Sequence, residues 1–172
     1  MESPLRRLAL GASLAMSLVA TTGCGASAMP PSIGHSLAGG RAPRLAELSR
    51  EEGNVGVHTA PTRVTVIDFW ASWCQGCTES IPALDELYRD KRSDGVVVIG
   101  VSVDEVPEAA SEAARRLRAT FPIVSDPRMR IAASYHVGQI PLTFVVDRAG
   151  TVRWVGRDPG AARQAVDAVL AE

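Results

Sequence analysis

The sequence predicts a three-layer α/β domain built around a mixed β-sheet. From about residue 63 onward, short apolar segments rich in β-branched residues alternate with segments of helical periodicity, which is typical of parallel strands joined by helices. The chain then places two strand-like segments on either side of a short turn and ends with one more helical segment. This last part adds an antiparallel hairpin, so that the sheet is mixed.

The individual elements follow from periodicity and length. Strands are expected where apolar runs are too short for a core helix, at 63–70, 96–101, 122–124, 142–146 and 151–155. Helices are expected where apolar residues recur every three or four positions, at 77–92, 107–119, 126–135 and 160–170. The stretch from 43 to 62 has no clear assignment.

Composition excludes nucleic acid as a partner. The 172 residues carry 18 basic and 19 acidic side chains, so no net field selects an anionic surface, and no long basic run is present. A folded part of roughly 130 residues is large enough to bury one core without disulfide staples. We therefore expect a single domain over residues 43–172.

Residues 1–23 have the layout of a secretory signal peptide. Arg6 and Arg7 precede an uncharged, mostly apolar run from Leu8 to Ala20, and small residues follow. This run of 13 residues is shorter than the about 20 that a membrane-spanning helix needs. We interpret it as a removable signal that exports the domain to the bacterial cell envelope, in periplasmic or other extracytoplasmic space.

Cys24 ends a segment, Thr21–Cys24, that resembles the lipobox of bacterial lipoproteins, although Thr21 stands where such boxes usually have Leu. The resemblance implies that Cys24 is acylated and anchors the mature protein, which is stable when more than one lipid chain is attached. The alternative is cleavage at Ala26–Ala28, which would release a soluble protein. The stretch 24–42 is rich in Gly, Ser, Pro and Ala and is expected to be a flexible tether.

The motif that carries chemistry is the pair Cys74 and Cys77, at the point where a predicted strand gives way to a helix. Unpaired N–H groups and the positive end of the helix dipole stabilise a thiolate at this position. A separation of three residues places both sulfurs on one face, within bonding reach. We expect Cys74 to be the exposed attacking thiol and Cys77 the buried resolving thiol.

Structural roles for the pair have less support. A disulfide that closes so short a loop restricts the unfolded chain little. A four-cysteine zinc site needs a second pair, which the mature chain lacks, and His58 and His136 show no ligand spacing. The sequence therefore favours redox chemistry without a bound cofactor or metal.

Two segments resemble the thioredoxin superfamily, and especially its extracytoplasmic TlpA/ResA-like branch. They are Val66–Cys77, which reads VIDFWASWCQGC, and Ile140–Asp147, which reads IPLTFVVD. The resemblance extends from about Val64 to the C-terminus. It implies a thioredoxin-like fold, reduction of protein disulfides through a Cys74/Cys77 cycle, and a membrane electron donor that reduces the pair again.

The resemblance also assigns roles to single residues. Pro141 corresponds to the cis-proline that faces the disulfide and whose neighbouring backbone pairs with substrate. Asp68 corresponds to the buried acid that helps to deprotonate the resolving cysteine, and burial in a strand raises the pKa of such a carboxyl. Trp73 is expected to shape the redox face, while Trp70 and Trp154 are expected in the core.

Two positions depart from the family pattern. Gly76 stands where a proline usually precedes the second cysteine, which leaves the start of the helix freer. Members tied to cytochrome c maturation often carry Glu three residues after the second cysteine, but this chain has Ser80 there and Glu79 one place earlier. No cytochrome role is therefore assigned.

Other functions would use the same cysteines differently. A copper-binding metallochaperone would hold Cu(I) through both thiolates with His136 or Met129, because soft sulfur ligands suit this ion. A thiol peroxidase would turn over peroxide at Cys74, but the signature Pro-x-x-x-Thr-x-x-Cys is absent. A non-catalytic, degenerate domain is disfavoured by the intact cysteine pair.

Overall fold

The computed structural model describes residues 28–51, 53 and 62–172. Within them one sheet has the strands β1 (Val64–Trp70), β2 (Val96–Ser102), β3 (Ile123–Ser125), β4 (Leu142–Asp147) and β5 (Val152–Gly156). Their order across the sheet is β3-β2-β1-β4-β5. β1 is parallel to β2, and β2 to β3, whereas β4 is antiparallel to both β1 and β5. The sheet is mixed, as the sequence predicts.

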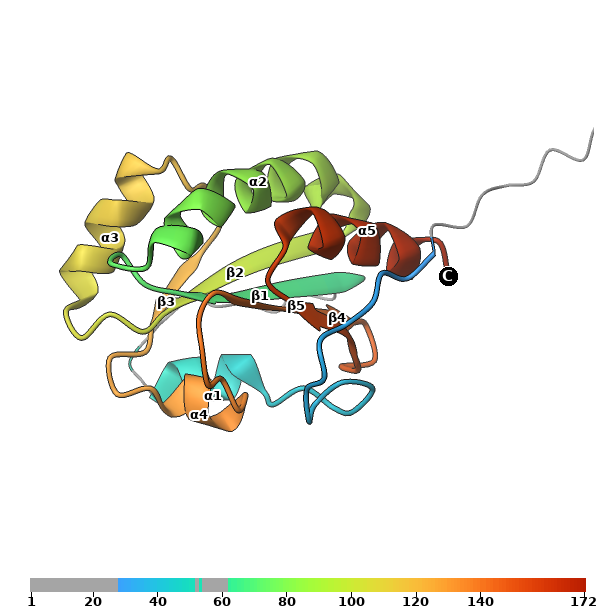
Figure 1. Ribbon diagram of the computed structural model, residues 1–172, viewed down its shortest axis with the longest axis horizontal. Coiled ribbons are helices and arrows are strands. Elements are labelled where there is room, and N and C mark those ends of the chain that lie inside the picture. Colours follow the sequence, from blue (N-terminus) through green and yellow to red (C-terminus); the bar gives the residue numbers. More distant parts are fainter. Residues whose placement is uncertain (1–27, 52, 54–61) are drawn as a thin grey trace, which may run out of the picture.

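Helices cover both faces of this sheet. They are α1 (Leu45–Glu51), α2 (Gln75–Lys91), α3 (Pro107–Arg116), α4 (Arg130–Ser134) and α5 (Pro159–Leu170), with a short 3-10 helix, η1, at Arg92–Asp94. In Figure 1, α2, α3 and α5 lie above the sheet, and α1 and α4 lie below it. The predicted three-layer α/β architecture is confirmed.

The central strand β1 separates two apolar clusters, because successive side chains of a strand point to opposite faces. Val66 and Trp70 belong to the cluster on the α2 side, which also contains Cys77. Ile67 belongs to the cluster on the side of α1 and α4. Asp68 alternates with these residues in the same way, so its carboxyl lies on the α2 side of the sheet.

Some predicted boundaries are wrong, for local reasons. The helix expected at 77–92 begins at Gln75, because Cys74 acts as its N-cap. The helix expected at 126–135 covers only Arg130–Ser134, because Asp126 lies before the helix and bonds to its first turn. The Asp126 carboxylate accepts the backbone N–H of Ile131 at 3.1 Å and of Ala132 at 2.8 Å. α1 was not predicted.

Residues 31–42, which were expected to be part of a flexible tether, lie along the outer edge of β5. The N–H of Ile33 donates to the carbonyl of Val155 at 2.9 Å, and the indole of Trp154 donates to the carbonyl of Pro31 at 3.1 Å. Further backbone hydrogen bonds in this region involve Gly39, Gly40 and Ala42. These contacts cover an edge strand whose backbone groups would otherwise be unpaired. The prediction of a flexible tether is therefore wrong for residues 31–42.

The predictions for the N-terminus mostly fall on residues 1–27. The signal peptide, Cys24 and the start of the alternative cleavage site at Ala26 lie outside the described residues, as does His58. Among the helices of the described part, none has the length and apolar character that a membrane span requires.

Candidate functional site

The redox pair sits at the first turn of α2. Cys74 is the N-cap residue, and its Sγ accepts the backbone N–H of Cys77 at 3.3 Å. The N–H groups of Cys77 and Thr78 also donate to the Cys74 carbonyl, each at 3.1 Å. The sulfur of Cys74 therefore lies at the positive end of the helix, where backbone donors and the dipole stabilise a thiolate.

Cys74 and Cys77 form a disulfide, with an S–S distance of 2.06 Å and a Cα–Cα distance of 5.3 Å. Cys77 is fully buried in the apolar cluster beneath α2, whereas Cys74 is partly exposed. An incoming sulfur can therefore reach Cys74 and not Cys77. This is the asymmetry that the sequence predicts for an attacking and a resolving thiol.

Pro141 lies against the redox turn. Its peptide bond with Ile140 is cis, as the family resemblance implies. A Cβ added at Gly76 would lie 3.7 Å from Cδ of Pro141, so the proline ring packs over Gly76, the second of the two residues between the cysteines. The structure thus brings Cys74, Cys77 and Pro141 together from two distant segments. The contact at Gly76 is of ordinary length, so the Cβ of an alanine would fit there.

Asp68 is fully buried in β1. The Thr143 hydroxyl on β4 donates to its Oδ1 at 2.7 Å, and Oδ2 has no hydrogen-bond partner within the described part of the chain. Burial raises the pKa of Asp68 to about 7, although the Thr143 bond lowers it. A carboxyl with such a pKa exchanges its proton near neutrality, which suits a general base.

Ser80, at the position of the family's Glu, and its neighbour Glu79 are placed differently. Ser80 is buried, and its hydroxyl donates to the Cys77 carbonyl at 2.9 Å. Glu79 is exposed and accepts a hydrogen bond from Gln75 Nε2 at 3.0 Å. The residue that replaces the family's Glu is therefore bound to the backbone of the resolving cysteine, and the nearby carboxylate lies at the surface.

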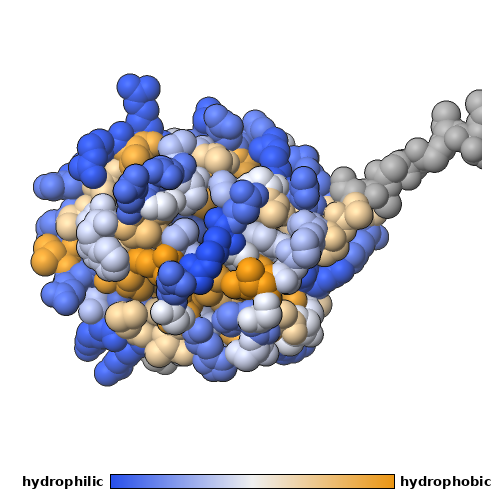
Figure 2. Space-filling model, in the orientation of Figure 1, coloured by the Kyte–Doolittle hydropathy of each residue, from blue (hydrophilic) through white to orange (hydrophobic). Residues whose placement is uncertain are grey.

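A groove of about 720 Å³ opens beside the redox turn. Trp73, Val106 and Met129 line it and are 70%, 56% and 50% exposed. They are three of the four large apolar residues that are exposed in the described part. Ile140, which precedes the cis-proline, lines the same groove. Figure 2 shows hydrophobic residues among hydrophilic ones at the left end of the molecule, where α2 begins.

A family model described as the AhpC/TSA family matches residues 38–155, more than half of the sequence. The chain belongs to this family. Thiol-disulfide oxidoreductase ResA of Geobacillus kaustophilus is 35% identical over 89 residues, which are 52% of this chain and 51% of that protein. ResA of Bacillus cereus is 27% identical over 114 residues, 66% of each chain. The match thus spans about half to two thirds of the length of these curated relatives.

Solved structures with a similar fold include proteins whose names also refer to thiol–disulfide exchange. A putative thiol:disulfide interchange protein DsbE from Chlorobium tepidum has a TM-score of 0.60 and 29% identity, over 64% of this chain and 82% of its own. A putative protein disulfide isomerase from Bacteroides thetaiotaomicron has a TM-score of 0.65 over 83% of this chain and 96% of its own, but its 22% identity shows the fold alone. This AhpC/TSA-family domain has a thioredoxin-like fold.

Asp104 holds the loop before the redox pair and was not predicted from the sequence. Its carboxylate accepts the Ser72 N–H at 2.9 Å, the Ser72 hydroxyl at 2.7 Å and the Ser102 hydroxyl at 2.7 Å. Asp104 is buried, and Ser72 stands two residues before Cys74. The available signal was an acid three residues after the apolar run 96–101, just beyond the carboxyl end of a parallel strand beside β1.

Replacing Asp104 with alanine is expected to lower the free energy of unfolding by about 2 to 4 kcal/mol, because three buried or half-buried donors on Ser72 and Ser102 lose their acceptor, at about 1 kcal/mol each. Urea unfolding at constant m-value measures the change. The exposed neighbour Glu105 is the matched control, and its replacement by alanine should change stability by no more than about 0.5 kcal/mol. Equal effects of both variants would show that Asp104 does not hold the loop.

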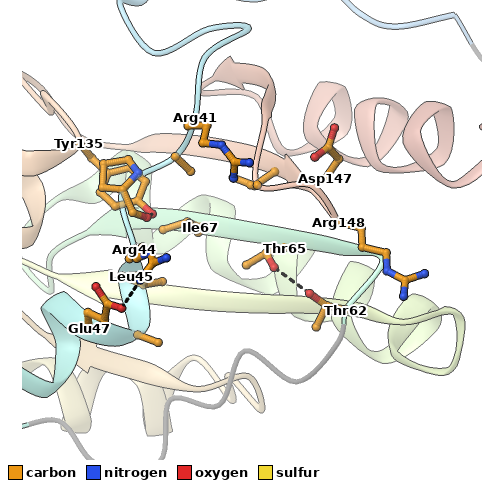
Figure 3. Close-up of a pocket in the computed structure, with 15 residues that line it drawn as sticks. Arg41, Arg44, Leu45, Glu47, Thr62, Thr65, Ile67, Tyr135, Asp147 and Arg148 are labelled. Carbon is orange, nitrogen blue, oxygen red and sulfur yellow. Dashed lines mark hydrogen bonds and ion pairs between the residues drawn. The ribbon is translucent and has the colours of Figure 1, made fainter.

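A second cavity, of about 510 Å³, lies on the other face of the sheet and is lined by Arg41, Ile67 and Tyr135 among others. Figure 3 shows Tyr135 and Arg41 above Ile67 of β1, with Arg44 and Glu47 below. Neither Cys74 nor Cys77 lines it. This cavity is therefore separate from the redox site.

Proposed function

We propose that this protein is a thiol–disulfide oxidoreductase that reduces protein disulfides through a dithiol–disulfide cycle of Cys74 and Cys77. One observation carries the proposal: a single helical turn holds a partly exposed sulfur and a fully buried one within bonding distance. The names of the relatives that are 29% to 35% identical, ResA and DsbE, support it.

The cycle begins with the reduced pair. The Cys74 thiolate attacks one sulfur of a substrate disulfide, a mixed disulfide forms, and the other substrate sulfur leaves as a thiolate that takes up a proton. The Cys77 thiolate then attacks the Cys74 sulfur, and the second substrate sulfur leaves. The substrate gains two electrons, and the cysteine pair loses two and ends as the disulfide seen in the structure.

Asp68 is proposed to accept the proton of Cys77 before the second step. The Cys77 thiol is buried, so an internal base is needed for its deprotonation. Asp68 lies on the same side of the sheet as Cys77 and has a pKa of about 7, which allows it to be ionised in a useful fraction of molecules at neutral pH.

A polypeptide substrate fits the groove beside Cys74. Trp73, Val106 and Met129 offer apolar surface there. Ile140 belongs to no helix or strand, and its backbone can pair with an extended chain in the manner of strand addition. We therefore propose that the substrate's cysteine is flanked by an extended segment with apolar side chains.

The place of action is proposed to be the bacterial cell envelope, with a lipid anchor at Cys24 and a membrane electron donor that reduces the pair again. Release of a soluble form after Ala28 is the alternative. If Cys24 is the anchor, Cys24→Ser should move the protein from the membrane fraction to the soluble fraction in the producing cell. An unchanged distribution would remove the anchor from the proposal.

Reduction of insulin disulfides tests the activity. With dithiothreitol as electron source, the protein is expected to accelerate the precipitation of insulin chains, and Cys74→Ser should match the buffer alone. Turnover of hydrogen peroxide without insulin reduction would indicate a peroxidase instead. Stoichiometric Cu(I) binding without reduction would indicate a metallochaperone, although His136 Nδ1 is hydrogen-bonded to the Ser36 hydroxyl at 2.8 Å.

A further inference from the structure

One guanidinium group bridges the segment that contains the cis-proline. Arg157 follows β5, and its Nη1 donates to the carbonyl of Pro141 at 3.0 Å, while Nη2 donates to Oε1 of Gln139 at 3.1 Å. The two acceptors lie on either side of Ile140. A guanidinium presents its donors in a rigid planar fork, so Arg157 fixes both neighbours of Ile140 relative to β5.

This bridge acts where few backbone hydrogen bonds hold the chain, although the Ile140 side chain packs against both apolar clusters. Ile140 lies between α4 and β4 and belongs to neither, and its N–H and carbonyl take no part in the backbone hydrogen bonds found outside the regular elements of the described residues. On one side Ile140 faces the groove beside Trp73. On the other, Pro141 packs over Gly76 in the redox turn.

Arg157 differs from the other arginine of this strand region. Arg153 forms ion pairs with Asp147 and Glu172, whereas Arg157 forms no ion pair within the described residues and bonds only to uncharged acceptors. The carboxylate next to it, Asp158, is engaged as the N-cap of α5. The placement of Arg157 is therefore set by the Gln139–Pro141 segment and not by an opposite charge.

We propose that Arg157 is a positioning residue for polypeptide substrates, which holds Gln139 and Pro141 so that the backbone of Ile140 is presented to an extended chain in the groove. The inference rests on the proposed function. A polypeptide disulfide needs this backbone for binding, whereas a small disulfide reaches the Cys74 sulfur directly. The loss of Arg157 should therefore separate the two kinds of substrate.

The experiment compares Arg157→Ala with the unaltered protein on insulin and on the small neutral disulfide 2,2′-dithiodipyridine. We expect KM for insulin to rise about tenfold, which corresponds to about 1.4 kcal/mol, with little change in kcat. The rate with the small disulfide should stay within about threefold, because its attack by the Cys74 sulfur needs no backbone contact at Ile140.

Three further variants make the result decisive. Arg153→Ala also removes an arginine, but near the start of β5, away from the Gln139–Pro141 segment. It should leave KM for insulin unchanged. Gln139→Ala removes one of the two acceptors and should raise KM for insulin less than Arg157→Ala does. Arg157→Lys keeps the positive charge but loses the planar pair of donors of the guanidinium. Its KM should therefore lie between those of the unaltered protein and Arg157→Ala.

Equal losses with insulin and the small disulfide, or an unchanged KM for insulin, would overturn the role of Arg157. Full recovery of KM by Arg157→Lys would also overturn it, since charge alone would then suffice. Failure of the proposed function looks different: the unaltered protein would not reduce insulin at all.

Discussion

Replacing Cys77 with serine is expected to stop turnover and to leave Cys74 covalently joined to its substrate. Cys77 is fully buried and bonded to Cys74, so it is the group placed to resolve a mixed disulfide at the exposed sulfur. Without it, the first attack still occurs and the adduct persists. Insulin reduction should fall to the level of the buffer alone, and non-reducing electrophoresis with mass spectrometry of the adduct should identify the trapped substrates.

Cys74→Ser is the matched control, because it removes the exposed sulfur from the same helical turn and keeps the buried one. It should trap nothing. Adducts that form on Cys77 in the Cys74→Ser variant would reverse the assigned order of attack. The absence of adducts in Cys77→Ser, with an active unaltered protein, would contradict the cycle itself.

The part of the site that could be predicted from the sequence is local. Cys74 and Cys77 are one helical turn apart, and the helix start follows directly from the strand before it. The buried acid Asp68 and the residues around Pro141 were assigned by family resemblance. Each of these inferences needs only a short stretch of sequence.

The part that could not be predicted depends on contacts between distant segments. Asp104 binds Ser72 across 32 positions, and Arg157 binds Pro141 across 16. Neither Asp104 nor Arg157 belongs to a motif. A single acidic residue after a strand, or a single arginine before a helix, is usually a solvent-exposed side chain, so neither indicates a buried contact. Their partners become known only when the strands are placed side by side.

The place of residues 31–42 along the edge of β5 could not be predicted for a related reason. Its composition is that of a linker, but the edge of β5 needs backbone partners, and small residues without bulky side chains can supply them. Backbone hydrogen bonding of this kind leaves no pattern of apolar side chains. Sequence composition therefore does not show that the folded domain already includes residues 31–42.

Replacing Asp68 with asparagine is expected to stabilise the protein at alkaline pH and to slow resolution of the mixed disulfide. The carboxyl has a pKa of about 7 in the folded state against 3.8 as the ordinary value, because it is desolvated. At a pH below 3.8 it is neutral in both states and costs nothing. As pH rises toward 7 the unfolded state ionises first, so the unaltered protein loses stability, by roughly 4 kcal/mol once pH exceeds 7.

Asparagine does not ionise, and its carbonyl can still accept the hydrogen bond from Thr143. The stability of Asp68→Asn relative to the unaltered protein should therefore grow between pH 4 and pH 8, as measured by urea unfolding at a series of pH values. Asp85→Asn is the control of opposite sign. Burial raises the pKa of Asp85, but hydrogen bonds from Thr120 and Arg89 outweigh it and hold this pKa below its ordinary value, so that variant should lose relative stability as pH rises.

The kinetic consequence of Asp68→Asn separates a proton acceptor from a merely buried acid. If Asp68 accepts the proton of Cys77, resolution of the mixed disulfide should slow about a hundredfold, within the usual range for general base catalysis, and its rise with pH around 7 should disappear. Stopped-flow release of the substrate thiol from a preformed adduct measures this step. A stability gain without any change in the resolution rate would leave Asp68 as a costly buried carboxyl and assign the deprotonation of Cys77 to another group.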